Sequence, residues 1–287
     1  MIRRLSGFIA AIVILLGTGA NMYAAPLPLA AAVPGGIVIV DLGLAHDNHA
    51  PQVTFNRQRV MVLKNAGHWQ GIVGIPLATK PGQQQLHISG QKTPVVFTVE
   101  AKAYAEQRLI IKDKRKVNPT KEDLQRIGRE RTRINKALAH WSDLGSVDTR
   151  FSLPVTGRMS SPFGLRRFFN DQPRKPHSGI DIAAPEGTPI QAPAAGRIIE
   201  AGDFFFNGNS VFIDHGQGLV TMYCHMSKIE VKPGQTVQKG ETIGAVGQTG
   251  RVTGPHLHWS VSLNDARVDP GLFFNDITAL LGPETDH

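Results

Sequence analysis

Residues 254–261 read GPHLHWSV, a short segment that opens on Gly and Pro and is rich in aromatic and branched side chains. This composition predicts a β-strand. Side chains two positions apart on a strand point to the same face, so His256 and His258 would line one groove. The stretch HSGIDIAAP from residue 177 has the same character and places His177 and Asp181 at an even spacing. The two segments together predict four polar side chains on one surface.

These four side chains suit a zinc ion. Zinc in hydrolytic sites takes three protein ligands from His, Asp or Glu and leaves its fourth position to water, whose pKa it lowers toward neutrality. The set would therefore supply three ligands and leave one imidazole for chemistry. His225 lies just after the apolar segment SVFIDHGQGLVTMY (210–223), two positions beyond Tyr223. If that strand neighbours the other two, His225 faces the same groove as a second uncoordinated imidazole.

Four motifs in this part of the chain resemble those of the lysostaphin/LytM-type zinc metallopeptidases, a family of peptidoglycan endopeptidases. In chain order they read SSPFGLRR (160–167), HSGIDIAAPEGTPI (177–190), GNSVFIDHGQGLVTMYCHM (208–226) and VKPGQTVQKGETIGAVGQTGRVTGPHLHW (231–259). The resemblance as a whole covers about half of the chain, and the motifs reproduce the family's order and spacing. The resemblance implies a C-terminal antiparallel-β peptidase domain of the lysostaphin/LytM type.

The same resemblance implies roles for five residues. His177, Asp181 and His258 would bind one Zn²⁺ per chain, and His225 and His256 would flank the bound water and the scissile carbonyl. An imidazole can take a proton from water, donate one to the leaving amine or, when protonated, stabilise the oxyanion. The sequence does not divide these tasks between His225 and His256.

Each candidate also has a structural interpretation. A single His in an apolar strand is more often a hydrogen-bonded structural group than a ligand, and only the joint occurrence at matching spacings favours a site. His215, at a strand end, is expected to bond to backbone and stay structural. Arg166 in SPFGLRR is a candidate to hold a substrate carboxylate or carbonyl. The alternative for Arg166 is a solvated guanidinium in a basic loop with Arg167, Arg174 and Lys175.

Cys224 is the single cysteine of the chain, which excludes an intrachain disulfide. Its neighbour His225 suggests a Cys/His nucleophile pair. Because adjacent residues on a strand point to opposite faces, the sequence instead predicts that Cys224 faces away from the groove, into packed structure.

The first residues predict export. Arg3 and Arg4 precede an apolar run over residues 8–20, which is short for a membrane span. We expect a signal peptide over residues 1–25, with small-residue cleavage sites between residues 24 and 32. An uncleaved N-terminal membrane anchor is the alternative. Export predicts the periplasm or cell envelope as the location.

The rest of the chain is expected to divide into four parts. Residues 34–105 form a β-sandwich accessory domain, and residues 106–145 form a linker with a helix. Residues 147–275 form the zinc metallopeptidase domain, and residues 276–287 form a tail. Short apolar runs punctuated by Gly, Pro and Asn predict that the first is a small β-sandwich, immunoglobulin-like in its strand spacing. Substrate positioning, partner contact or covering of the groove are its expected uses.

The linker begins with a basic loop and predicts one amphipathic helix, from Lys121 to Trp141. Thr120 offers the N-cap of this helix. Its apolar stripe, expected to pack on a β domain, comprises Leu124, Ile127, Ile134, Leu138 and Trp141.

The composition is that of an ordinary globular protein, with 41% hydrophobic and 19% charged residues and a formal net charge of +8. A basic exported protein suits an anionic polymer such as peptidoglycan. The chain has no nucleic-acid-binding motif and few aromatic residues among its basic ones, which argues against a nucleic-acid partner. An envelope regulatory protein is a further candidate partner.

The combined prediction is an exported zinc-dependent endopeptidase that hydrolyses amide bonds in peptidoglycan peptide stems or cross-bridges, for cell-wall remodelling or lysis. The alternative is a non-catalytic LytM-like module that binds peptidoglycan or recruits or activates another hydrolase. Modules of that kind are typically degenerate at the metal ligands, whereas all five positions are filled here, which favours the enzyme. The resemblance leaves the bond open between glycyl-glycine bridges and bonds that involve D-alanine and diaminopimelate.

Overall fold

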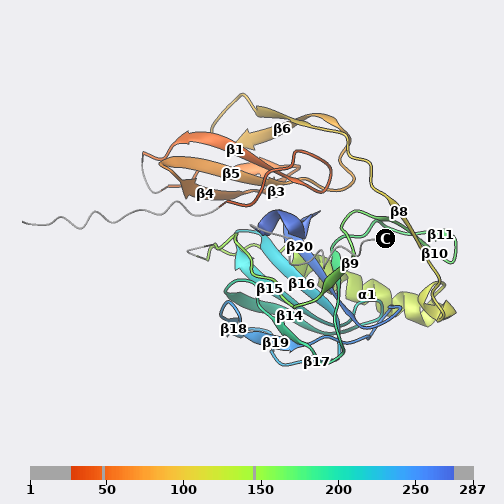
Figure 1. Cartoon of the computed structure of the whole chain (residues 1–287). Helices are drawn as coiled ribbons and strands as arrows, with labels where there is room; N and C mark the ends of the chain where they lie inside the picture. Colours follow the sequence, from red (N-terminus) through yellow and green to blue (C-terminus); the bar gives the residue numbers. More distant parts are fainter. Residues whose placement is uncertain (1–26, 47–48, 145–146, 275–287) are drawn as a thin grey trace, which may run out of the picture.

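The structure, a computed structural model, describes residues 27–46, 49–144 and 147–274. Figure 1 shows two β regions, one above the other, joined by a linker that carries the helix α1. The fold is mainly β, as predicted, and α1 is the one α-helix of the described residues. Within these ranges no helix has both the length and the apolar character needed to cross a membrane. The predicted signal peptide (1–25) and tail (276–287) lie outside the described residues.

The N-terminal β region is a sandwich of two sheets, with strand orders β1-β5-β4 and β3-β2-β6-β7. Val53, Phe55, Val73 and Leu86 are buried between the sheets. This arrangement confirms the predicted β-sandwich. Its strands are β1 (Ile37–Leu44), β2 (Val53–Phe55), β3 (Gln58–Arg59), β4 (Met61–Asn65), β5 (His68–Gly74), β6 (Gly82–Ile88) and β7 (Val95–Val99).

An eight-stranded antiparallel sheet forms the C-terminal region, in the order β18-β14-β15-β16-β20-β12-β9, with β21 paired to β20. Its strands are β9 (Arg158–Ser161), β12 (Ile180–Ala183), β14 (Gly196–Phe204), β15 (Gly208–Gly216), β16 (Leu219–Met226), β18 (Thr236–Val237), β20 (His256–Leu263) and β21 (Ala266–Val268). A smaller sheet joins β13 (Pro189–Gln191), β19 (Thr242–Ala245) and β17 (Lys228–Ile229), and the short helices are η1 (Lys114–Lys116) and η2 (Pro270–Phe273).

The two faces of the large sheet have different surroundings. Tyr223 and Trp259, paired across β16 and β20, point into the main hydrophobic core. On the opposite face, Cys224 belongs to the apolar cluster formed with the last turns of α1. Asp181 is paired with His258, and His258 with Cys224, so the three lie in one row across β12, β20 and β16. The predicted metal site and α1 therefore share one face of the sheet.

The helix α1 (Lys121–Leu138) begins at the predicted residue and ends short of the predicted one. Thr120 is its N-cap, as predicted, and forms a capping box with Asp123. Leu138 in the last turn is buried against the sheet. The predicted apolar stripe is wrong at Leu124, which is 57% exposed. The first turns are held instead by ion pairs, such as that of Asp123 with an arginine of the linker.

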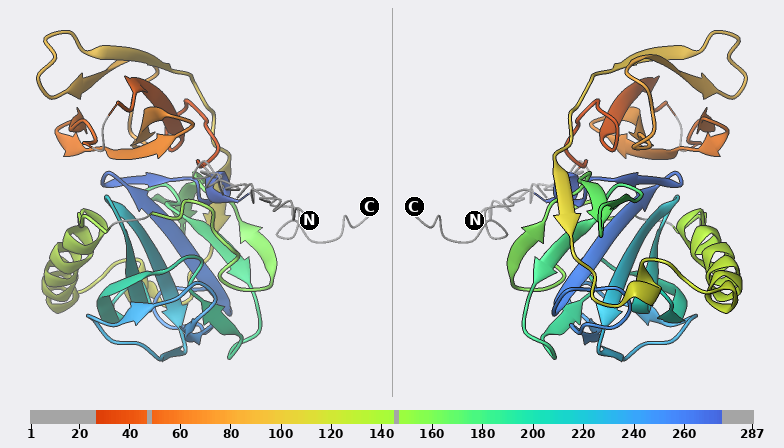
Figure 2. Two further views of the ribbon diagram at one scale, coloured as in Figure 1. Left: turned by 90° about the vertical axis from the view of Figure 1, so that its left-hand side faces the viewer. Right: turned by 90° about the vertical axis from the view of Figure 1, so that its right-hand side faces the viewer.

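The linker adds a strand to the peptidase region, because β8 (Glu106–Leu109) pairs in parallel with β10 (Arg166–Phe169), which also pairs with β11 (Gln172–Pro173). The right-hand view of Figure 2 shows β8 in yellow, running down before the chain reaches α1. Beyond β8, Ile111 and Val117 pack on Phe169. The linker therefore lies against the peptidase region along much of its length.

The two β regions are fixed to each other by polar and apolar contacts. Asn264, in the turn after β20, donates from Nδ2 to the carbonyl of Gly74 (3.0 Å) and accepts the N–H of Gly74 (2.7 Å). The side chain of Gln217 accepts the N–H of Val62 at 3.0 Å. The main hydrophobic cluster also includes Ile72 of the sandwich, so one core continues across the boundary.

Candidate metal centre

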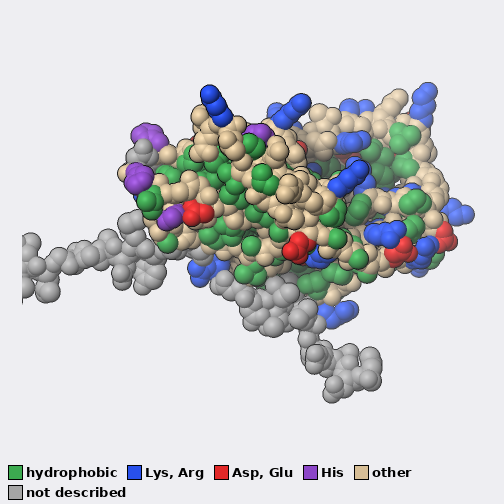
Figure 3. Space-filling view, turned by 90° about the horizontal axis from the view of Figure 1, so that it is seen from above, with side chains coloured by type: hydrophobic (Ala, Val, Ile, Leu, Met, Phe, Trp, Pro, Cys, Tyr) green, Lys and Arg blue, Asp and Glu red, His purple; other side chains and the backbone are tan. Residues whose placement is uncertain are grey.

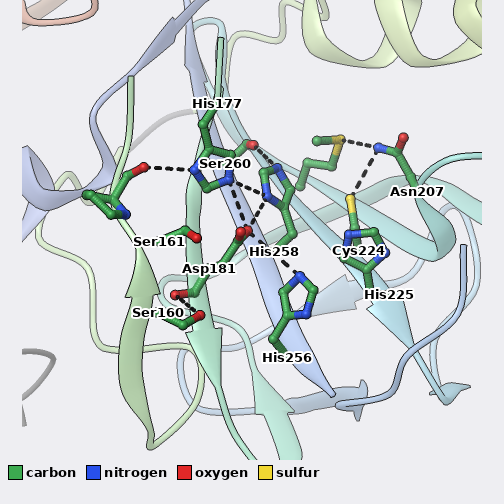
Figure 4. A network of polar contacts seen from close by, with 12 residues as sticks. Ser160, Ser161, His177, Asp181, Asn207, Cys224, His225, His256, His258 and Ser260 are labelled. Carbon is green, nitrogen blue, oxygen red and sulfur yellow. Dashed lines mark hydrogen bonds and ion pairs between the residues drawn. The ribbon is translucent and has the colours of Figure 1, made fainter. Parts of the chain in front are cut away.

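Three ligand atoms converge where β12 and β20 lie side by side, as Figure 4 shows. Asp181 Oδ1 lies 3.0 Å from His177 Nε2 and 2.7 Å from His258 Nδ1, and the two nitrogens are 3.0 Å apart. All three residues are buried. One carboxylate oxygen and two imidazole nitrogens form a donor set that suits Zn²⁺. His177, Asp181 and His258 are therefore the residues that could hold a metal.

Each of the two imidazoles has its other nitrogen bound by the protein. His177 Nδ1 donates to the carbonyl of Pro162 at 2.8 Å, and His258 Nε2 lies 2.9 Å from Ser260 Oγ. When the nitrogen that faces away from the cluster carries the ring proton, the other nitrogen turns its lone pair toward the cluster. Ser260 was not predicted, although its place two residues after His258 on β20 puts it on the same face.

The electrostatics of Asp181 and His258 favour the protonation states that bind a cation. Burial raises the pKa of Asp181, but hydrogen bonds to His177 and His258 outweigh it and hold that pKa well below its usual value. Burial lowers the pKa of His258 to about 4, against the opposing effect of Asp181. An ionised carboxylate and neutral imidazoles are the forms that ligate a metal.

His177 reaches the cluster by a different route from the predicted one. β12 begins at Ile180, so His177 precedes the strand and strand alternation does not orient it. Its N–H donates to the carbonyl of Leu165 at 2.9 Å. The chain then bends at Gly179, where a Cβ would lie 2.3 Å from a backbone oxygen of β20. The predicted strand relation between His177 and Asp181 is therefore wrong, because this bend brings the two side chains together.

His225 faces the cluster because its backbone leaves the regular strand conformation, with φ of 66°. Tyr223 lies in the core on the other face, so the predicted same-face relation of the two residues is wrong. The His225 ring lies 6.1 Å from that of His258, and its Nδ1 donates to the carbonyl of Thr249 at 2.8 Å. Burial, together with the smaller effects of His256 and His258, lowers the pKa of His225 to about 3, so the ring is neutral.

His256 lies beside the cluster without belonging to it. It shares a face of β20 with His258, as the alternation predicts. Its Nδ1 donates to the carbonyl of Gly254 at 2.8 Å, and its Nε2 is 3.9 Å from Asp181 Oδ1. The structure thus brings together all five side chains that the sequence singled out.

Cys224 is buried in packed structure, as predicted, but it faces the same side of the sheet as His258, so the prediction that it points away from the groove is wrong. The irregular φ of His225 places two consecutive side chains toward one side. Sγ of Cys224 accepts a hydrogen bond from Asn207 Nδ2 at 3.3 Å, and burial raises the pKa of the thiol to about 12. A buried, protonated thiol is not a nucleophile.

The two arginines of the SPFGLRR motif make different contacts. The Arg166 side chain is 61% exposed, lies 3.4 Å from Glu106 and lines a pocket between the two β regions that includes Tyr104. Arg167 instead donates from Nη2 to Asp181 Oδ2 at 2.6 Å. The role of Arg166 in substrate binding stays a prediction. The contact of Arg167 was missed, since nothing in a single sequence separates two adjacent arginines.

Comparison with known proteins identifies the family. Residues 175–270 match the model of peptidase family M23, and residues 30–102 match the model of the M23 N-terminal domain. The crystal structure of a protein assigned to peptidase M23 from Pseudomonas aeruginosa is 44% identical, with a TM-score of 0.72 over 85% of this chain and 96% of that one. The chain belongs to peptidase family M23. This confirms the resemblance to the lysostaphin/LytM-type peptidases.

Two curated relatives of this M23 protein have names that describe enzymes. The DD-carboxypeptidase/endopeptidase Mpg of Neisseria meningitidis is 46% identical over 116 residues, which are 40% of this chain and 27% of that protein. The peptidoglycan DD-endopeptidase ShyA of Vibrio cholerae is 43% identical over 113 residues, which are 39% of this chain and 26% of that protein. The matched part thus spans about a quarter of the length of these relatives.

Proposed function

We propose that this protein is a zinc-dependent endopeptidase that hydrolyses amide bonds in the peptide part of peptidoglycan. The observation that carries the proposal is the convergence of Asp181 Oδ1, His177 Nε2 and His258 Nδ1 beside two further imidazoles. A module that only binds peptidoglycan has no need for two uncoordinated imidazoles next to a set of three metal ligands. The names of the relatives Mpg and ShyA support peptidoglycan as the substrate and a DD-endopeptidase specificity.

A zinc ion held by the three ligand residues would supply an activated water and polarise the scissile carbonyl. The protein's own contribution is proton transfer by His225 and His256. Each of these rings donates its Nδ1–H to a backbone carbonyl and so presents an unprotonated Nε2. That nitrogen can accept a proton from water and pass it to the leaving amine, or stabilise the oxyanion once protonated.

The charge of the protein supports an anionic substrate. The formal net charge is +8, of which Arg3 and Arg4 of the predicted signal peptide contribute +2, and the face seen in Figure 3 carries Lys and Arg side chains with few acidic ones. Such a surface attracts an anionic polymer over a distance of about one Debye length, roughly 8 Å at physiological salt. With the predicted export signal, this supports the periplasm or cell envelope as the site of action.

The test is digestion of purified sacculi by the purified protein, with and without a chelator, together with metal analysis. We expect one zinc per chain and release of peptides that stops on chelation and returns when zinc is added. Mass spectrometry of products from defined muropeptides then identifies the bond. A protein that holds no stoichiometric metal and releases no peptide would instead favour the non-catalytic regulatory module.

A further inference from the structure

The carboxylate of Asp181 is held at both of its oxygens. Oδ1 belongs to the ligand cluster, whereas Oδ2 accepts the 2.6 Å hydrogen bond from Arg167 Nη2. This contact is largely buried, with side-chain exposures of 16% for Arg167 and 9% for Asp181. Because the guanidinium occupies Oδ2, the carboxylate presents a single oxygen to a cation and its plane is fixed.

Arg167 is held in turn by Gln107, on the linker strand β8. Arg167 Nε donates to Gln107 Oε1 at 2.9 Å, and Gln107 Nε2 donates to Ser161 Oγ at 2.7 Å. The strand registers bring these side chains together, since Gln107 pairs with Arg167 across β8 and β10, and Ser161 pairs with Asp181 across β9 and β12. A continuous chain of contacts therefore runs from the linker to the candidate ligand.

Gln107 lies outside both segments that match family models, residues 30–102 and 175–270. We propose that Gln107 is a positioning residue of the metal centre: it fixes Arg167, and Arg167 orients Asp181. This inference rests on the proposed binding of zinc by the three ligand residues. It makes the linker strand a part of the metal-binding unit, in addition to its role as a connection between two β regions.

The test is the zinc affinity of the full-length protein, titrated in competition with a chromogenic chelator. Gln107→Ala should weaken zinc binding about tenfold, the lower end of the range for contacts that support metal ligands. Gln107→Glu keeps an acceptor for Arg167 Nε and should restore most of the affinity. Arg108→Ala is the matched control, because the Arg108 guanidinium lies on the opposite face of the same strand, 4.3 Å from the Phe168 ring. It should leave zinc affinity unchanged.

A double-mutant cycle separates positioning from general loosening. Because Gln107 acts through Arg167, Gln107→Ala should add no further loss of zinc affinity to Arg167→Met. The unfolding midpoints of the zinc-free variants show whether each is folded. Ser161→Ala removes only the second anchor of Gln107, so it gives a milder variant that should weaken zinc binding to a smaller degree.

Three results would overturn the proposal: wild-type zinc affinity in Gln107→Ala, an equal loss in Arg108→Ala, or additive losses in the double variant. Zinc affinity is measured without catalysis, so this outcome is separate from that of the proposed function. A wild-type protein that binds zinc but releases no peptide overturns the proposed function alone. A wild-type protein that binds no zinc overturns both.

Discussion

The imidazoles of His225 and His256 lie side by side, with ring centroids 4.9 Å apart. Each is anchored at Nδ1 by a backbone carbonyl, that of Thr249 for one ring and that of Gly254 for the other. The anchors fix the tautomer and leave Nε2 of both rings free to exchange a proton. Neither ring belongs to the cluster of three candidate ligands. Loss of either ring should therefore affect turnover without removing the metal.

We expect His225→Ala and His256→Ala to keep stoichiometric zinc and to lose about 100- to 10,000-fold in kcat/KM, the usual range for a removed proton-transfer group. Metal analysis and the initial rate of peptide release from muropeptides measure the two properties separately. Loss of zinc from either variant would show that the residue is a ligand and would end its assignment to proton transfer.

The three candidate ligands should behave in the opposite way. His177→Ala, Asp181→Ala and His258→Ala should each lose stoichiometric zinc, because a catalytic zinc has only three protein ligands. Ser260→Ala is the matched variant: it removes the partner of His258 Nε2 but no ligand, and should weaken zinc binding only about tenfold. Retained zinc and activity in His258→Ala would contradict the ligand set.

The stability of the protein should fall in mild acid because of His215. Its ring is buried, with Nδ1 donating to the carbonyl of Ala195 at 2.8 Å, which confirms the predicted structural role. Burial lowers the pKa of His215 from 6.5 to about 4. Between these pH values the unfolded chain binds a proton and the folded chain does not. The free energy of unfolding therefore decreases as pH falls, by about 3 kcal/mol from this group.

The measurement is urea denaturation of the zinc-free protein between pH 7 and about pH 4, the range over which this group exchanges its proton. His215→Gln cannot titrate, so its free energy of unfolding should fall less steeply than that of the wild type. The absolute stability of the variant does not enter the comparison. Parallel curves for the two proteins would show that His215 contributes nothing to the pH dependence.

The contact of Asn264 with Gly74 should contribute strongly to stability. Asn264→Ala leaves the buried N–H and C=O of Gly74 without their partners, and we expect a loss of about 2 to 4 kcal/mol in the free energy of unfolding. Asn264→Asp keeps the acceptor for the N–H but sets a carboxylate oxygen against the buried carbonyl of Gly74, so it should not rescue the loss. Chemical denaturation measures both. A loss below about 1 kcal/mol in Asn264→Ala would contradict a role for the paired hydrogen bonds.

The residues of the site could be predicted from the sequence better than their placement. Metal sites use few residue types at fixed spacings, so five side chains were found without a structure. Alternation orients residues only inside a regular strand, and it failed where the chain bends at Gly179 and where φ is positive at His225. Gln107 and Arg167, 60 positions apart, meet only through the pairing of β8 with β10. The polar strand EQRL has no apolar pattern that would have predicted this pairing.

The core shared by the two β regions has a consequence for the order of folding. The sandwich contributes Ile37 and Ile72 to the main cluster, but the atoms that lie against Gly74 come from Leu263 and Val268, on strands near the end of the chain. During synthesis the sandwich is made first, and this apolar surface stays uncovered until those strands follow. Because the shared core joins side chains of the sandwich to those of the late strands, we expect the two regions to unfold in coincident transitions, which denaturation followed by two different probes would test.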